Sequence, residues 1–225
     1  MPLEVRLRDE ATLDNYFVLP QLQPLIDALQ GQLADGGEPS LYLHGPPGSG
    51  KSHLLQSCCQ LPDEQALYLP LADLRTYAPA EVLQGVERLA RICLDDLDAV
   101  AGDAAWELEL FNLCNRARQS GCRLVFSAAA APRALGVGLP DLLSRLTWGP
   151  VFALPRAADE DKAEILRFRA ARRGLGLSPG VASYIVSRAP REMARLLALL
   201  DELDRASLAQ QRALSIPFVK QALGW

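Results

Sequence analysis

The fold of this chain is decided by Gly45-Pro46-Pro47-Gly48-Ser49-Gly50-Lys51-Ser52, which follows the apolar run Leu41-Tyr42-Leu43. A loop that wraps a polyphosphate must turn its backbone N–H groups inward, and the three glycines allow that path without Cβ clashes. We expect Lys51 to bring its charge to the β- and γ-phosphates and the Ser52 hydroxyl to bind Mg²⁺ at the start of the next helix. The order of strand, loop and helix favours a nucleotide-binding P-loop over an ordinary Gly/Pro turn.

Composition and length narrow the class of protein. With 225 residues and 49% hydrophobic content, the chain can bury one full core and a small second one. The formal net charge of −4 gives no bulk attraction to phosphate backbones, so DNA is expected only as an indirect partner. No apolar run approaches the length of a membrane span, and no membrane partner is expected. The five cysteines form no C-x-x-C pair, which favours reduced, buried thiols and a cytoplasmic location.

Short apolar runs alternate with helical stretches, which predicts an α/β domain with a parallel five-stranded sheet flanked by helices. The strands are expected at 41–44, 66–71, 90–94, 123–127 and 151–154, and the helices at 52–60, 79–89, 106–118 and 139–145.

After residue 154 the strands stop, and Asp159 is a good N-cap for a helix that runs toward Arg173. Pro190 is expected to open a later helix, with Arg191 in its first turn and an apolar face that belongs to a small core. The predicted domains are a nucleotide-binding domain at 1–157 and a small all-α lid domain at 158–225.

A second motif is the apolar strand Arg91-Ile92-Cys93-Leu94 ending in Asp95-Asp96, a Walker B pattern. Asp95 is expected to hold, through water, the same Mg²⁺ that the Ser52 hydroxyl binds from the P-loop. Two roles are equally consistent with Asp96. It could orient or deprotonate the attacking water, or it could be an ordinary acidic residue at the start of the loop after the strand. His44 and His53 flank the P-loop without a partner motif, which favours structural roles for both over catalysis.

A P-loop, a strand-end Asp-Asp and a trailing helical lid together resemble an AAA+ ATPase module. Thr12-Leu13-Asp14-Asn15-Tyr16-Phe17-Val18 is similar to the segment that packs beside the adenine in the replication initiator DnaA. The stretch 142–149 is similar to the DnaA box with the S-R-F-x-W-G pattern, and 189–193 resembles its sensor-2 lid helix. A helix-turn-helix DNA reader does not follow the lid in this sequence, so the chain resembles most the Hda family of DnaA regulatory inactivators.

The resemblance implies a bound nucleotide, ADP or ATP, with Mg²⁺. It also implies that Ala129 stands at the sensor-1 position. Alanine cannot hydrogen-bond a γ-phosphate or a water, so we expect weak intrinsic ATPase and a structural role for the nucleotide. The expected nucleotide-binding residues are Asn15, Tyr16, Phe17, Gly45, Pro46, Pro47, Gly48, Ser49, Gly50, Lys51, Ser52, His53 and Arg191.

The function that the resemblance implies is regulatory. With the DNA-loaded sliding clamp, such a protein meets ATP-bound DnaA and promotes hydrolysis of that ATP, which blocks re-initiation of chromosome replication. Arg145 corresponds to the arginine finger, which would neutralise the charge that develops on the transferred phosphoryl oxygens of the partner.

Other interpretations stay open at this point. A free-standing ATPase of helicase-loader or remodelling type would use Asp96 to drive its own hydrolysis, and a passive adaptor would need no nucleotide. The clamp-binding peptide of the family has only Met1-Pro2-Leu3 as a counterpart here, so clamp contact is equally open. The sequence does not decide between a monomer and a homodimer.

Overall fold

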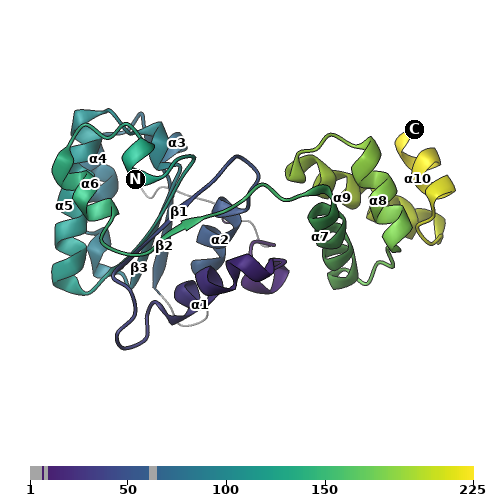
Figure 1. Ribbon diagram of the computed structural model, residues 1–225, viewed down its shortest axis with the longest axis horizontal. Helices are drawn as coiled ribbons and strands as arrows, with labels where there is room; N and C mark the ends of the chain where they lie inside the picture. The colour runs from purple at the N-terminus through teal and green to yellow at the C-terminus, as the bar shows by residue number, and fades with distance from the viewer. Residues whose placement is uncertain (1–6, 8–9, 61–64) are drawn as a thin grey trace. The chain divides into compact units, whose positions relative to one another are not determined.

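The computed structural model describes residues 7, 10–60 and 65–225 of the chain (Figure 1). The chain divides into two compact units, Met1–Pro155 and Arg156–Trp225, whereas the sequence places the division after residue 157. No helix in the described ranges is long and apolar enough to cross a membrane.

The first unit contains one five-stranded sheet in the order β2-β3-β4-β1-β5, and all of its pairs are parallel. The predicted parallel sheet is therefore confirmed. Parallel strands are covered on both faces, which explains why they read as short apolar runs. The strands are β1 (Ser40–His44), β2 (Ala66–Pro70), β3 (Arg91–Asp95), β4 (Arg123–Ala128) and β5 (Val151–Ala153).

Two layers of helices cover the sheet (Figure 1). Because side chains alternate along a strand, Leu41 and Leu43 of β1 pack in the core under α1 and α2, while Tyr42 packs in the core under α4, α5 and α6. The helices are α1 (Gln23–Gly31), α2 (Lys51–Cys58), α3 (Leu71–Leu74), α4 (Pro79–Leu83), α5 (Ala104–Ser120) and α6 (Pro140–Leu146). Short 3-10 turns are η1 (Leu13–Asn15), η2 (Pro20–Leu22), η3 (Val86–Arg88), η4 (Leu97–Ala99) and η5 (Pro132–Ala134).

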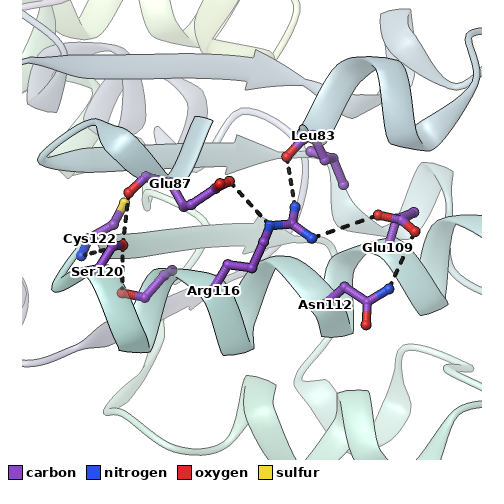
Figure 2. Close-up of polar contacts among 8 residues, drawn as sticks. Leu83, Glu87, Glu109, Asn112, Arg116, Ser120 and Cys122 are labelled. Atoms are coloured by element: carbon purple, nitrogen blue, oxygen red, sulfur yellow. Dashed lines mark hydrogen bonds and ion pairs between the residues drawn. The ribbon is translucent and has the colours of Figure 1, made fainter. Parts of the chain in front are cut away.

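Arg116 joins α5 to the segment that carries α4 and η3 (Figure 2). Its Nη2 donates to the carbonyl of Leu83 over 2.8 Å, and its Nε lies 3.2 Å from Oε2 of Glu87. Glu109 of α5 approaches the same guanidinium at 3.9 Å, and the Ser120 hydroxyl donates to the carbonyl of Glu87 over 2.8 Å. These contacts fix α4 and η3 against α5.

The helix predicted at 79–89 is wrong in its second half. α4 ends at Leu83, Gln84 is extended, and Gly85 takes a left-handed φ of 78° before η3 begins. A glycine in that conformation ends a helix, which the apolar spacing did not reveal. Helix α1 was not expected from the sequence.

The second unit is a small helical domain, as predicted. Its helices are α7 (Asp159–Arg172), α8 (Pro179–Arg188), α9 (Met193–Gln210) and α10 (Ile216–Leu223). The apolar face of α9 lies in the core of this unit with residues from the other three helices. This core includes Leu166, Ile185, Leu196, Leu200, Leu203 and Phe218, all buried.

Two helix starts in this unit differ from the sequence prediction. Ala158, not Asp159, is the N-cap of α7, and its N–H donates over 3.1 Å to Oδ2 of Asp161, so the carboxylate that caps this end comes from within the helix. α9 begins at Met193, so Arg191 lies before the helix rather than in its first turn. Pro190 and the extended Glu192 delay the start of the helix.

Candidate nucleotide site and candidate finger arginine

The P-loop leaves the carboxyl end of β1, and its last two residues, Lys51 and Ser52, open α2 after the N-cap Gly50. Gly48 and Gly50 take left-handed φ angles of 76° and 98°. A Cβ at Gly45 would lie 2.3 Å from the carbonyl oxygen of Leu154, so only glycine fits this close approach of two backbones. The backbone therefore favours glycine at 45, 48 and 50, and the inward direction of the N–H groups remains a prediction.

The Lys51 ammonium lies inside the loop. Its Nζ donates to the carbonyls of Gly45 over 2.7 Å and Pro46 over 3.2 Å, and the side chain is buried. The buried hydroxyl of Ser49 has no hydrogen-bond partner among the residues that the structure describes. The first N–H groups of α2 also lack partners within the helix and favour an anion. This set of donors fits a polyphosphate.

A segment before β1 closes over the P-loop helix. The Tyr16 ring lies 5.6 Å from the His53 ring, and a Cβ at Gly50 would meet Tyr16 Cε2 at 2.9 Å. A ring nitrogen of His53 lies 2.9 Å from the carbonyl oxygen of Thr12. Burial raises the pKa of Tyr16 to about 12, so its hydroxyl stays protonated. The structure therefore brings Tyr16 and His53 together beside the P-loop.

The neighbours Asn15 and Phe17 hold this segment in place. Asn15 Nδ2 donates to the carbonyl of Glu10 over 3.2 Å, and the Phe17 side chain packs against the core under α1 and α2. Nucleotide contact by Asn15, Tyr16, Phe17 and His53 remains a prediction.

Asp95 ends β3, and its side chain is completely buried. The hydroxyl of Tyr68 donates to Oδ2 over 2.6 Å, the hydroxyl of Ser127 donates to Oδ1, and the Asp96 N–H donates to Oδ1 over 3.2 Å. β3, β4 and β1 are neighbouring parallel strands, so their carboxyl ends lie at one edge of the sheet. The Asp95 carboxylate at the end of β3 and the P-loop after β1 therefore share this edge. The expectation that Asp95 and Ser52 serve one Mg²⁺ requires this juxtaposition.

Tyr68 and Ser127 are the residues of this site that sequence reasoning missed. Each is the single hydroxyl-bearing residue of its strand. A hydroxyl near the end of a strand beside the Walker B strand was the available signal. Both donors balance a carboxylate that is removed from water.

Asp96 is partly buried and takes a left-handed φ of 56°. Its pKa is raised by burial and then by the negative charges of Asp95 and Asp98, while Lys51 acts in the opposite direction. A carboxyl group with a raised pKa is a better proton acceptor, which suits a general base. Its catalytic role remains a prediction.

Ala129 follows β4 and offers only its backbone here: its N–H donates over 2.8 Å to Oδ1 of Asp98, an exposed side chain. Among the described residues, no group of three or more His, Cys, Asp or Glu side chains could hold a metal ion. A Mg²⁺ ion near Ser52 and Asp95 would therefore depend on phosphate oxygens and water for its other ligands.

Glu107 connects the Walker B side of the domain to α6. Its buried carboxylate accepts three backbone hydrogen bonds, from Gly102 over 2.7 Å, Gly138 over 3.0 Å and Leu139 over 2.7 Å. Leu139 is the N-cap of α6, the helix that carries Arg145. One carboxylate thus fixes both the turn after β3 and the start of that helix.

Arg145 lies at the amino edge of the sheet, opposite the P-loop. Arg145 lines a small cavity together with Ser40 and Leu124, which lie at the starts of β1 and β4. The segment that follows α6 reaches the same edge, where the Tyr42 N–H donates over 3.0 Å to the carbonyl of Pro150. A five-residue strand spans about 13 Å. Roughly the length of β1 therefore separates the two edges of the sheet.

The guanidinium of Arg145 contacts two aromatic rings. Its Cζ lies 3.9 Å from the ring centre of Trp148 and 5.4 Å from that of Phe111, and its Nε donates to Asn115 Oδ1 over 3.1 Å. Among the described residues no carboxylate forms an ion pair with it. Arg145 is thus an oriented cation without a charged partner in the part of the chain that the structure describes.

Comparisons with known proteins agree with this geometry. Domain III of DnaA from Thermotoga maritima superposes with a TM-score of 0.78 at 22% identity, covering 98% of each chain. AMPPCP-bound DnaA from Aquifex aeolicus gives 0.72 at 19% identity, covering 87% of this chain and 66% of that one. These likenesses show the AAA+ fold.

An uncharacterized protein of Haemophilus influenzae is 41% identical over 227 residues, which cover 99% of this chain and 97% of that protein. Residues 159–223 match the family model of the Hda lid domain. The chain belongs to the Hda- and DnaA-related AAA+ family. The part of this Hda-related chain that matches the family model contains all four lid helices, from α7 to α10.

Two further predictions concern Arg191 and the candidate clamp peptide. Arg191, the sensor-2 candidate, is exposed in the turn before α9, and its contact with a phosphate remains a prediction. The candidate clamp peptide Met1-Pro2-Leu3 lies outside the described residues. The cysteines are free, and four of the five are buried, as predicted.

Proposed function

We propose that this protein is a cytoplasmic regulator of DnaA that binds ADP or ATP, with Mg²⁺, in its own P-loop. Together with the DNA-loaded sliding clamp, it stimulates hydrolysis of the ATP bound to DnaA and so prevents re-initiation of chromosome replication. It acts by inserting Arg145 into the nucleotide site of DnaA. DNA is reached only indirectly, through the clamp.

The observation that carries this proposal is the position of Arg145. Arg145 lies at the amino edge of the sheet, whereas the P-loop of its own domain lies at the carboxyl edge. The stack with Trp148 and Phe111 and the bond to Asn115 orient the guanidinium in advance. An oriented cation stabilises charge that develops on phosphoryl oxygens without reorganising first.

The chain's own nucleotide is proposed to be structural. Lys51 and the amides at the start of α2 would hold the phosphates, and Ser52 and Asp95 would place Mg²⁺, which neutralises phosphate charge when bound. The relative from Aquifex aeolicus with this fold is a DnaA bound to AMPPCP, which supports a nucleotide at this position. With alanine at 129, no side chain there can hydrogen-bond a γ-phosphate or a water.

The test uses DnaA loaded with labelled ATP and clamp loaded on DNA. Arg145→Ala should bind ADP and melt as the native protein does, yet its stimulation of hydrolysis should fall by a factor of about 10³ or more. Arg88→Ala, an exposed arginine of η3, is the matched control and should stimulate normally. Undiminished stimulation by Arg145→Ala would remove the arginine from the proposed mechanism.

A free-standing ATPase is the second candidate, and the environment of Asp96 favours it. This carboxyl group has a raised pKa, and the positive charge of Lys51 acts on it from the P-loop. Robust steady-state ATP hydrolysis by the protein alone, lost in Asp96→Asn, would support the motor over the regulator. Lys51→Ala separates both from a passive adaptor, which would inactivate DnaA without binding nucleotide.

A further inference from the structure

Arg118 shares the indole of Trp148 with Arg145. The Cζ atom of Arg118 lies 4.9 Å from the ring centre, and that of Arg145 lies 3.9 Å from it. The separation of the two guanidinium groups therefore cannot exceed the sum of these distances. Both arginines and Trp148 also line one small cavity of about 20 Å³. Two cations from α5 and α6 thus form a single cluster.

This pair carries unbalanced charge. Among the described residues, neither Arg118 nor Arg145 forms an ion pair with a carboxylate. Two like charges at such a separation repel each other, and the indole face offsets only part of that cost. An anion that contacts both groups would relieve the repulsion, which makes the cluster a candidate anion site.

Both guanidinium groups keep donors that no described residue uses. A guanidinium that lies over a ring has its face covered, while its N–H groups point outward in its own plane. Arg145 uses Nε for Asn115 and keeps both Nη atoms, and Arg118 is exposed on the last turns of α5. Planar forks of this kind bind phosphate oxygens through paired hydrogen bonds.

We propose that Arg118 is a second phosphate-binding residue of this surface, which donates to phosphate oxygens of the nucleoside triphosphate held by the partner protein. This inference rests on the proposed function. Arg145 contacts the oxygens on which charge develops during hydrolysis, and Arg118 contacts oxygens that are charged before and after it. Arg118 therefore strengthens the encounter with the ATP-bound partner, while Arg145 determines the rate within the complex.

The experiment measures stimulated hydrolysis of DnaA-bound ATP against the concentration of this protein. Arg118→Ala should raise the concentration for half-maximal stimulation about tenfold and leave the maximal rate within about twofold, since one charge-assisted hydrogen bond pair is lost from binding. Arg118→Lys should raise this concentration less, because lysine keeps the positive charge although it lacks the planar, two-pronged set of donors of the guanidinium. Arg145→Ala should instead lower the maximal rate.

Arg118→Met tests whether the side chain merely covers Trp148. Methionine keeps an apolar stem over the indole without a charge, so it should behave as Arg118→Ala does. If Arg118→Met behaves as the native protein, the role is packing and the inference is wrong. Because Arg118 is exposed, all three variants should fold, which the melting temperature checks.

The remaining outcomes separate this inference from the proposed function. A normal Arg118→Ala beside a defective Arg145→Ala overturns the role of Arg118 and leaves the function standing. Normal behaviour of both variants removes Arg145 from the mechanism as well. Failure of the native protein to stimulate hydrolysis at all overturns the function itself. A DNA contact is tested by fluorescence anisotropy with a labelled duplex, and weaker duplex binding by Arg118→Ala would assign the arginine to DNA instead of the nucleotide.

Discussion

The hydroxyl of Tyr68 donates a 2.6 Å hydrogen bond to Oδ2 of Asp95, which joins the second strand of the sheet to the Walker B carboxylate. Burial, and then the charge of Asp95, raise the pKa of Tyr68, so the hydroxyl keeps its proton and remains a donor. With Ser127 on the opposite neighbouring strand, Asp95 is held from both sides. The orientation of the carboxylate is therefore built into the sheet.

Removing either hydroxyl should destabilise the nucleotide domain. Tyr68→Phe and Ser127→Ala each leave a buried carboxylate oxygen short of a donor, and each should lower the free energy of unfolding by about 2 kcal/mol. Urea unfolding followed by circular dichroism measures the change. Tyr77→Phe is the control, because Tyr77 is 49% exposed, and it should change stability by less than about 0.5 kcal/mol. Equal stabilities for Tyr68→Phe and the control would contradict the structural role of this bond.

Glu107 should be among the most sensitive positions outside the apolar core. Glu107→Ala leaves three backbone N–H groups, of Gly102, Gly138 and Leu139, without their acceptor, and should cost about 3 kcal/mol or more in urea unfolding. Glu109→Ala on the same helix removes a contact at 3.9 Å from Arg116 and a 3.3 Å hydrogen bond from Asn112, both only partly buried, and should cost less than about 1 kcal/mol. A similar loss in both variants would show that the three amides find other partners.

Asp96 should make the protein less stable at neutral pH than it would be with an uncharged side chain. The folded-state pKa of Asp96 is raised, so the folded protein binds this proton more tightly than the unfolded chain does. Asp96→Asn should therefore raise the melting temperature at pH 7, and asparagine also tolerates the left-handed φ.

The gain from Asp96→Asn should shrink as the pH falls through the raised pKa, because the native carboxyl group then becomes neutral as well. Thermal melts from pH 7 down to pH 4 test the sign. A gain that grows on acidification would mean that the pKa is lowered in the folded protein.

The local motifs were predictable because each carries its own backbone chemistry. Three features each indicate one local structure: the glycines indicate the P-loop, the apolar run before Asp95 indicates a buried strand, and the loss of strands after residue 154 indicates the helical lid. The sheet and the lid follow from them. The error at 79–89 arose from one glycine. The apolar spacing predicts that the helix continues to residue 89, but Gly85 takes a left-handed φ and the helix ends before it.

The contacts that support the site were not predictable in this way. Tyr68 and Ser127 meet Asp95 only because β2 and β4 flank β3, and Glu107 meets Gly138 only because the chain returns past α5. Strand order and chain return are non-local, so no single stretch of sequence contains them. The stack of Arg118 on Trp148 has the same origin.

Gly45 should tolerate no side chain. The Cβ of Gly45→Ala would lie 2.3 Å from the carbonyl oxygen of Leu154, so the loop must shift. Since such backbone strain costs about 1–3 kcal/mol, ADP binding measured by calorimetry should weaken roughly tenfold or more. Gly180→Ala, where the added Cβ meets nothing within 4 Å, should bind ADP normally. Native affinity in Gly45→Ala would show that the loop adapts.

The most direct measurement is a single-turnover assay of DnaA-bound ATP in the presence of loaded clamp, comparing Arg145→Ala with Asp96→Asn. If the arginine at the amino edge serves the partner's site, Arg145→Ala should abolish stimulation and Asp96→Asn should retain it. Loss of stimulation in Asp96→Asn with normal stimulation by Arg145→Ala would contradict the proposal, since the activity would then depend on the chain's own nucleotide site.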